Sequence, residues 1–571
     1  MGQVPHPGRR LLAVRRGNPS RGRNHGRIGA ARRARDPEGG RVSRSFDAVV
    51  IGGGANGLVA ATALGKSGLR VLLLEAAEAL GGQSRLVEFA PGFRAAPLAT
   101  DPGWLPPAVA RATEIDSPAR LSVEAPVTIA AAGEHLTLWR DTARAADAIR
   151  PLSHADAKRW PSFIARLRKL AGFLETLYRV PPPDVNAPAG ELLSFIGLAR
   201  RFRGLGREDM LEFLRTLPMS VWELLDDFFE SGLLKAAVAP GGMVGVRQGP
   251  RSGGTGFALL HGLVGAEAGV ARGRAPWRDG PEAFTRAAHE AALRAGVTVR
   301  TGAQVARIEV RDESVAGVVI STGETISTSR VLSTADAART FLGWVDPVWL
   351  DPEFLHAVRN IRYRDSTAWV LYALAGLPEI PGLTPEALRG VITLTPSLKA
   401  LEQAADCAKY GSMSERPHVE VTLPSLHFPG LAPEGKHVLV ARVQHAPYRL
   451  GNGTAWDAAG RETLERAVTD AIAAVIPGFV GRVLHRTLLV PPDIEARFGL
   501  TAGAASHGEV ALDQILFMRP VAGWARYATP IAGLYLGGAG AHPGPGVLGG
   551  PGWLAAQRLL GNRPVRAGES S

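Results

Sequence analysis

Cysteine is almost absent from this chain, since Cys407 is the only one among 571 residues. A single cysteine excludes an intramolecular disulfide, a redox-active cysteine pair and a cysteine zinc cluster. The histidines of the C-terminal half also lack a ligand spacing on one helix, so we expect no metal site. These histidines are His418, His427, His437 and His445.

A long apolar run without glycine or proline is missing as well. The longest uncharged stretch runs from Tyr527 to Gln557, but 13 of its residues are Gly or Pro. Such a stretch cannot form one continuous membrane-spanning helix. We therefore expect a cytoplasmic protein, with peripheral contact to a membrane surface as an open alternative.

Negative charge is scarce at the N-terminus. The net charge of the chain is +12, and residues 1–44 hold 12 arginines against only Asp36 and Glu38. The basic balance therefore belongs to this tail and not to a face of the folded part, so we expect no nucleic-acid partner. Residues 1–44 show no periodic apolar face and are expected to form a disordered Arg-rich tail, with a second short tail over residues 563–571.

A glycine-rich turn follows the first apolar run of the chain. Gly52, Gly54 and Gly57 fill the three glycine places of G-x-G-x-x-G, after residues 46–51 and before a helical pattern. The first glycine permits a tight turn, the second lets backbone approach a pyrophosphate, and the third brings the helix close to the sheet. The helix would direct its N-terminal amides, including those of Ala55 and Asn56, toward phosphates.

An acidic residue stands where a ribose-binding carboxylate is expected. A second apolar run ends at Glu75, 23 positions after Gly52. An acid about 20 residues after the first glycine typically binds the ribose 2′-hydroxyl. A carboxylate there disfavours a 2′-phosphate, so the pattern indicates FAD or NAD rather than NADP.

A double glycine decides between these two cofactors. Gly81, Gly82 and Gln83 follow Glu75 after five residues. This spacing resembles the glutathione-reductase-like flavoproteins, which include amine oxidases and carotenoid desaturases. In that superfamily the double glycine passes close to the diphosphate and ribityl chain of the flavin, so the resemblance implies FAD. The single cysteine excludes a disulfide reductase.

The order of the patterns predicts two interleaved domains in an α/β protein. We expect a Rossmann-like FAD-binding domain of the glutathione-reductase-like kind, interleaved with an antiparallel-sheet plus helical substrate domain. The FAD-binding parts are residues 45–140, 281–340 and 491–562. A helical cap is expected over residues 141–280, with apolar stripes at 153–177 and 220–237. The substrate sheet is expected over residues 341–490, with strands at 366–378, 418–424 and 436–445 and a helix at 454–476.

Two later segments are expected to complete the cofactor site. By resemblance to the superfamily, the backbone of Val305 meets the adenine. A strand at residues 534–536, a glycine-rich turn and a helix from residue 552 could present amides to the ribityl and ring end of the flavin. We therefore assign Gly538 and His542 to cofactor binding.

The whole of residues 46–562 resembles the phytoene-desaturase-related flavoproteins, most closely the pyridine nucleotide-disulphide oxidoreductase domain-containing protein 2 group. The segments that carry the resemblance are VVIGGGANGLVAA, GPRSGGTGFALLHGLVG, PPDIEARFGL, HGEVALDQILFMRP and GLYLGGAGAHPG. The resemblance implies an FAD-dependent enzyme that moves hydride between flavin N5 and a C–C bond of a largely apolar molecule, as a desaturase, saturase or isomerase.

No residue stands out as the catalytic one. His542 is a candidate for a polar group that faces the flavin, with Arg519 and Gln514 behind it, although a structural role for His542 beside Pro543 is an equal alternative. The other functions left open are a flavin amine or alcohol oxidase, and an FAD-containing interaction protein without turnover. No second dinucleotide fingerprint is present, so bound NAD(P)H is not expected, and the electron acceptor, quinone, oxygen or another, stays open.

Overall fold

The computed structural model describes residues 45–99, 101–131, 133–182, 192–365, 367–451 and 456–561. Contacts within the chain separate Met1–Val42 from Ser43–Ser571, and all the elements below lie in the second unit. The tails expected at residues 1–44 and 563–571 lie outside the described residues.

A five-stranded parallel sheet forms the centre of the FAD-binding domain. Its strands, in spatial order, are β17 (Leu534–Leu536), β11 (Val331–Ser333), β1 (Ala48–Ile51), β2 (Val71–Leu74) and β7 (Thr298–Arg300). The strands β1 and β2 are short and wholly apolar because both faces of the sheet are covered. The strands come from three distant parts of the chain, which confirms the interleaved α/β fold expected from the sequence.

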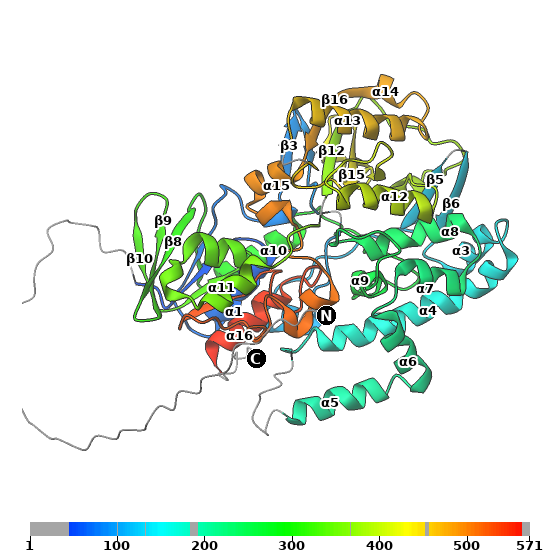
Figure 1. Ribbon diagram of the computed structural model, residues 1–571. Coiled ribbons are helices and arrows are strands. Elements are labelled where there is room, and N and C mark those ends of the chain that lie inside the picture. The colour runs from blue at the N-terminus through cyan, green and yellow to red at the C-terminus, as the bar shows by residue number, and fades with distance from the viewer. Residues whose placement is uncertain are drawn as a thin grey trace, which may run out of the picture. The chain divides into compact units, whose positions relative to one another are not determined.

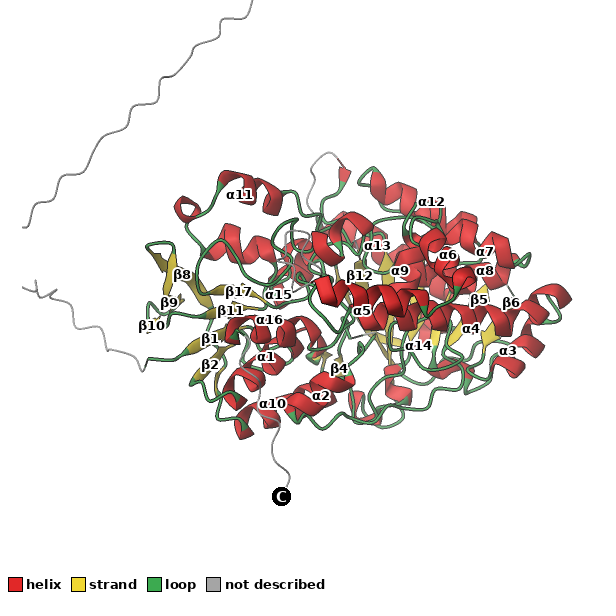
Figure 2. Cartoon of the chain, turned by 90° about the horizontal axis from the view of Figure 1, so that it is seen from below, coloured by secondary structure: helices red, strands yellow, loops and turns green. Residues whose placement is uncertain are grey.

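Helices cover one face of this sheet and a small second sheet covers the other. The helices are α1 (Ala55–Lys66), α10 (Ala283–Arg294) and α16 (Gly550–Leu560). Both views show α1 and α16 side by side (Figures 1 and 2). The opposite face packs on the antiparallel strands β8 (Val305–Arg311), β9 (Ser314–Ile320) and β10 (Thr325–Ser327), and on α11 (Pro352–Arg359).

A seven-stranded sheet forms the second domain. Its spatial order is β16 (Val483–Leu489), β12 (Thr367–Leu374), β15 (His437–Gln444), β14 (His418–Thr422), β13 (Val391–Thr393), β5 (Val127–Ala131) and β6 (Glu134–Leu138). Neighbouring strands are antiparallel except β13 and β5, which are parallel, so the sheet is mixed and not purely antiparallel as expected. The helix α13 (Ala458–Ala473) packs its apolar side on one face, and α12 (Leu398–Lys409) lies nearby.

The pairing of β5 and β6 moves the expected boundary between the domains. Both strands lie within residues 45–140, the range expected for the first FAD-binding part, yet they extend the seven-stranded sheet. A short apolar strand carries no local signal of which sheet it will join, because its partner β13 lies more than 250 residues away.

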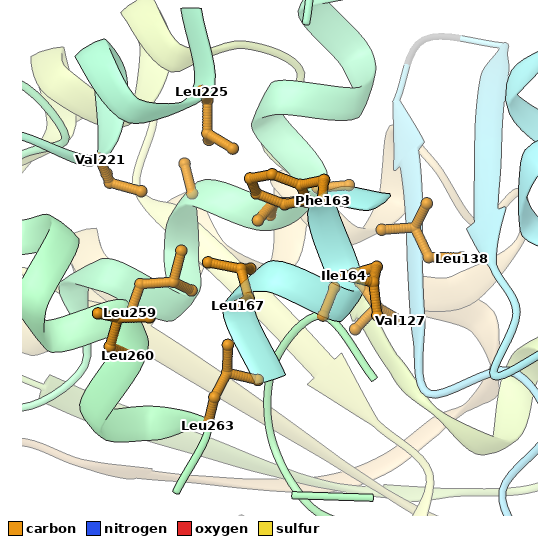
Figure 3. Packing of buried hydrophobic residues seen from close by; sticks show 14 of the residues in the cluster. Val127, Leu138, Phe163, Ile164, Leu167, Val221, Leu225, Leu259, Leu260 and Leu263 are labelled. Carbon is orange, nitrogen blue, oxygen red and sulfur yellow. The ribbon is translucent and has the colours of Figure 1, made fainter. Parts of the chain in front are cut away.

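A layer of helices covers the end of the seven-stranded sheet at β5 and β6. The layer consists of α3 (Thr142–Ile149), α4 (His154–Leu177), α5 (Leu192–Arg203), α6 (Arg207–Thr216), α7 (Val221–Phe228), α8 (Gly232–Val238) and α9 (Thr255–Gly262). Figure 3 shows Phe163 and Leu167 of α4 between Leu225 of α7 and Leu260 of α9, while Ile164 of the same helix lies beside Val127 of β5. The apolar stripe predicted at residues 153–177 is thus core packing.

The helical stretch expected at residues 220–237 consists of two helices, α7 and α8. At the break, the Asp156 carboxylate accepts hydrogen bonds from the backbone N–H groups of Glu230 (3.0 Å) and Ser231 (2.8 Å). The Ser231 hydroxyl then accepts from the Leu234 N–H and caps α8. These polar contacts end the first helix and start the second, which the apolar spacing alone did not show.

The remaining elements are short. They are the hairpin β3 (Val87–Ala90) and β4 (Phe93–Ala95), and the helices α2 (Pro107–Thr113), α14 (Phe479–Arg482) and α15 (Pro491–Phe498). Within the part of the chain that the structure describes, no helix combines the length and apolarity needed to cross a membrane.

Candidate functional site: a cofactor and substrate cavity

The turn between β1 and α1 excludes side chains at two of its glycines. At Gly52 the backbone has φ +105°, and a Cβ would overlap the Thr334 hydroxyl. A Cβ at Gly57 would overlap the carbonyl oxygen of Gly52. The protein's own structure therefore requires glycine at these two positions. The tight turn requires it at Gly52, and the close packing of helix on strand requires it at Gly57.

Gly54 differs from both, because nothing in the protein itself requires a glycine there. Its backbone is extended, with φ −80° and ψ −177°, a conformation open to any residue. A Cβ on Gly54 would meet only the Cα of Gly82, at 3.8 Å, and would otherwise point into open space. Gly54 and Gly82 thus form a bare backbone wall, which leaves room for a group outside the protein.

The N-terminus of α1 opens onto the same space. No side chain caps this helix and no acidic residue lies in its first turn. No acidic side chain of α1 itself compensates its free N–H groups and the positive end of its dipole, which favours an anionic ligand such as a diphosphate. Beside them, the buried Oδ1 of Asn56 has no hydrogen-bond partner among the described residues.

Glu75 holds this turn in place from the end of β2. Its Oε2 accepts a hydrogen bond from the Gly53 N–H (2.6 Å) and its Oε1 accepts one from the Ala77 N–H (2.8 Å). Each carboxylate oxygen keeps further acceptor capacity. The residue is half-buried, so its carboxylate is open to a ribose hydroxyl.

One cavity of about 670 Å³ runs from this turn to the seven-stranded sheet. Nine of the residues predicted to bind the cofactor line it: Gly52, Gly54, Ala55, Asn56, Glu75, Gly81, Gly82, Gln83 and Val305. Its other end is formed largely by apolar side chains, among them Val391, Leu423, Leu431 and Val440. The cavity therefore joins a polar backbone-lined part to an apolar part.

The polar part fits FAD. The bare wall at Gly54 offers space and the uncapped helix N-terminus offers N–H donors for a diphosphate. The unpartnered Asn56 Oδ1 offers an acceptor for a hydroxyl of the ribityl chain, and Glu75 offers acceptors for the adenosine ribose. Gly57 lies behind the turn, outside the lining, and supports it by packing. The assignment of individual contacts to FAD stays a prediction.

The C-terminal glycine-rich turn reaches the cavity through residues other than those we singled out. Ala539 and the segment 544–549 line it, whereas Gly538 and His542 do not. A Cβ at Gly538 would overlap the Thr334 carbonyl oxygen, so this glycine serves close packing on β11. The sequence identified the turn but not which of its residues would face inward.

His542 lies behind the cavity wall. Its Nε2 is 3.0 Å from the Val180 carbonyl oxygen, and its ring meets Tyr178 edge to face. Burial lowers the pKa of His542 to about 4, so the ring is neutral at pH 7. Gln514 is likewise occupied, because its Oε1 accepts the Arg362 N–H at 2.8 Å. Neither side chain is placed to face a flavin.

Arg519 ties the loops around the cavity to each other. It is buried, and within the described part of the chain its guanidinium donates to backbone carbonyl oxygens alone. The acceptors are Ala539 (2.8 Å), Gln514 (3.0 Å), Glu509 (3.1 Å), Gly508 (3.2 Å) and Ser506. Although burial lowers its pKa to about 10, Arg519 stays charged at neutral pH. This placement assigns it to structure and not to chemistry.

Substituting Arg519→Lys should therefore destabilise the fold. A lysine has its donors on one nitrogen and cannot reach acceptors on both sides, which leaves buried carbonyls unpaired. We expect the free energy of unfolding of the holoprotein to fall by about 2–4 kcal/mol in urea denaturation. The exposed Arg359→Lys serves as the control. Unchanged unfolding in Arg519→Lys would contradict the structural role.

Sequence reasoning missed several residues of the cavity wall. Thr334 follows β11 as Gly52 follows β1. Because parallel strands end at the same edge of a sheet, the sequence could have predicted that Thr334 lies in the cavity wall. Its hydroxyl donates to the Ile51 carbonyl at 2.8 Å. His507 also lines the cavity, with φ +54° and a buried Nδ1 that has no partner among the described residues. His507 begins the segment HGEVALDQILFMRP, which carries part of the family resemblance, but the resemblance assigned no role to this histidine.

The charge of the cavity wall is positive. Seven arginines line it: Arg85, Arg140, Arg272, Arg274, Arg339, Arg389 and Arg497. The lining carboxylates are Glu75, Asp101 and Glu267. Only some of this charge is balanced within the protein, as where Arg274 donates to Asp101 at 2.7 Å. The excess suits anionic occupants, of which a diphosphate is one.

Substituting Glu75→Ala should weaken FAD binding without unfolding the protein. If the carboxylate takes ribose hydroxyls, the loss of charge-assisted hydrogen bonds is worth roughly 1.5–3 kcal/mol. That corresponds to about a 10- to 150-fold loss of FAD affinity, measured by fluorescence titration of reconstituted apoprotein. The FAD affinity of Glu75→Gln should lie between those of the wild type and Glu75→Ala.

The matched control is Glu78→Ala, an exposed acid three residues later that does not line the cavity. It should leave FAD affinity unchanged. Equal affinity in well-folded Glu75→Ala and Glu78→Ala proteins, checked by circular dichroism, would show that Glu75 supports only the turn.

Comparison with known proteins gives consistent results. A family model described as flavin-containing amine oxidoreductase matches residues 56–485. The chain is 32% identical over 554 residues to pyridine nucleotide-disulfide oxidoreductase domain-containing protein 2 of Rattus norvegicus, which covers 92% of this chain and 95% of that protein. It is 24% identical over 254 residues to phytoene desaturase (neurosporene-forming) of Cereibacter sphaeroides, covering 44% of this chain and 47% of that one.

The fold is also found among solved structures. Putrescine oxidase bound to putrescine superposes with a TM-score of 0.54 at 15% identity, covering 90% of this chain and 98% of that chain. At this identity the likeness concerns the fold alone. It agrees with a parallel nucleotide-binding sheet joined to a mixed substrate sheet.

Proposed function

Because the chain belongs to the flavin-containing amine oxidoreductase family, we propose that it is an FAD-dependent desaturase, saturase or isomerase that acts on a C–C bond of a largely apolar small molecule. That the chain is an FAD-dependent oxidoreductase follows from the family. The kind of bond and the kind of substrate are the proposal.

The observation that carries the proposal is the apolar end of the cavity that begins at the glycine turn. The part beyond the glycine turn is bounded by Val391, Leu423 and Val440 of the seven-stranded sheet region, with Phe428 and Leu431 beside them. Such a wall binds hydrocarbon and excludes water from the space next to the cofactor. The similarity to a phytoene desaturase, an enzyme named for a desaturation, supports the same choice.

Within this cavity the protein binds and orients. Gly54 and the N-terminus of α1 would hold the diphosphate, and Glu75 the ribose. When bound, FAD supplies the ability to take up or return a hydride from carbon. The apolar wall then fixes which C–H bond lies next to the cofactor.

A flavin amine oxidase is the second candidate from the sequence, and the charge of the cavity disfavours it. A protonated amine would enter a wall with seven arginines and three carboxylates, where its charge is repelled. The charge argument does not apply to an alcohol oxidase, because an alcohol is neutral. An alcohol oxidase would differ from a desaturase in its electron acceptor.

The test is anaerobic mixing of the holoprotein with alkene, alcohol and amine substrates while the flavin absorbance is followed. We expect reduction by a molecule with an apolar C–C bond, and faster re-oxidation by a quinone than by air. Reduction by amines with rapid re-oxidation in air would favour an oxidase. No change in the absorbance of the oxidised or the pre-reduced flavin, and no isomerised product, across a broad panel would favour a protein that keeps FAD without turnover.

A further inference from the structure

A polar row crosses the face of the seven-stranded sheet that borders the cavity. Thr393, Glu420 and Arg442 are direct neighbours across β13, β14 and β15. Side chains alternate along a strand, and the intervening residues face the core under α13. Two residues further along the same strands and on the same face, Thr422 and Val440 line the cavity. The polar row therefore lies beside the apolar wall.

Arg272 lies on this row from the loop that precedes α10. One guanidinium nitrogen contacts the Glu420 carboxylate and the other contacts the Thr393 hydroxyl. Arg272 lines the cavity with only 8% of its surface exposed, and its Nε has no partner among the described residues. It is thus a buried cation at the junction of the polar row and the cavity.

The charges of this cluster do not balance. Glu420 contacts both Arg272 and Arg442, so two guanidinium groups share one carboxylate. Burial alone would raise the pKa of Glu420, but the two arginine charges overcome it and hold that pKa well below its usual range. The adjacent His418 is neutral at pH 7, since burial lowers its pKa to about 4. One positive charge remains, which is unfavourable when buried without an anion.

We propose that Arg272 binds a carboxylate of the substrate, whose hydrocarbon part lies along Val391, Leu423 and Val440. The substrate class is then an apolar carboxylic acid, not a neutral hydrocarbon or an amine. This inference rests on the proposed function, because it names the substrate class of the same cavity. The carboxylate would supply the negative charge that the cluster lacks, through a charge-assisted hydrogen bond to the guanidinium.

The test is binding of decanoate, decanol and decylamine to the holoprotein, measured by isothermal titration calorimetry and by the shift of the flavin absorbance. These probes share one chain and differ only in the head group. We expect decanoate to bind at least about 10-fold more tightly than decanol, and decylamine most weakly. Equal binding of decanoate and decanol would overturn the inference.

Two substitutions should move the affinity in opposite directions. Arg272→Gln should weaken the binding of decanoate by about 10- to 100-fold and leave the affinity for decanol within about threefold of the wild type. Glu420→Gln removes the competing carboxylate and should tighten decanoate. The control Arg278→Gln changes an exposed arginine of the same loop, outside the cavity lining, and should leave both unchanged.

The inference can still be tested if the Arg272→Gln variant does not fold. If Arg272→Gln is unfolded by circular dichroism, Glu420→Gln and Arg272→Lys still report, because the first raises the positive charge and the second keeps it. Decanoate affinity should rise in Glu420→Gln and stay within about threefold of the wild type in Arg272→Lys, and an affinity that does not rise in Glu420→Gln would overturn the inference. Binding that depends on Arg272, with no flavin reduction by any substrate, would support the inference and refute the proposed turnover.

Discussion

A Gly54→Val protein is expected to fold and to contain no FAD. In the structure, a side chain at Gly54 meets only the Gly82 Cα at 3.8 Å, and the backbone conformation is open to any residue. The protein itself therefore tolerates the valine. The side chain would instead occupy the space in front of the α1 N-terminus, where the diphosphate is expected.

The measurement is FAD released on denaturation, per mole of purified chain. We expect Gly54→Val to fall below about a tenth of the wild-type content, with Gly54→Ala in between. The matched control is Gly172→Val, at a helical glycine that also has open space around it but does not line the cavity. Full FAD content in Gly54→Val would place the diphosphate elsewhere.

The second large effect expected is loss of stability in mild acid. Four buried histidines have a lowered pKa, mainly because burial disfavours the charged ring. They are His261 and His445, with a pKa of about 3, and His418 and His542, with a pKa of about 4. In the unfolded chain these rings take up protons near pH 6.5, so below that pH the unfolded state binds more protons and is favoured.

The size of this effect is comparable with the whole stability of a domain. Each of the four histidines lowers the free energy of unfolding by about 2 kcal/mol between pH 8 and pH 5, up to about 8 kcal/mol together. Asp365 acts in the opposite direction, because burial raises its pKa to about 7, and offsets about 3 kcal/mol. The net loss of about 5 kcal/mol approaches the roughly 5–15 kcal/mol that holds a domain folded.

Urea denaturation at several pH values measures how the free energy of unfolding changes with pH. His445 has φ +68° and no partner for either ring nitrogen among the described residues, and Asn tolerates that backbone conformation. His445→Asn should therefore shrink the difference between pH 8 and pH 5 by about 2 kcal/mol. The exposed His356→Asn should not change it. A stability that is flat from pH 8 to pH 5 would contradict the neutral buried histidines.

The sequence was sufficient where function depends on local order along the chain. The strand, glycine turn, helix and acid from residue 46 to Glu75 are adjacent in sequence, so their spacing determines their geometry. The structure accordingly brings Gly54, Gly82 and Glu75 to one cavity wall. The interleaving of the two domains was also predictable, because each half of the nucleotide domain carries its own strand pattern.

The sequence was insufficient where a side chain's direction depends on distant partners. Arg272 reaches the cavity wall because its loop meets Glu420 and Thr393, more than 100 residues further along the chain. His542 stands in a correctly identified turn but faces Tyr178. The strand at Val127–Ala131 joins the second sheet because of a partner near residue 392. No local pattern encodes such contacts.

A crystal structure of the holoprotein would test the central claim most directly, since that claim assigns the two ends of one cavity to cofactor and substrate. We predict density for the FAD diphosphate against the backbone of Gly54 and Asn56, the adenosine ribose against Glu75, and free space between the flavin ring and Val440. A diphosphate bound away from Gly54, or a flavin ring outside the cavity that Val440 lines, would contradict the account.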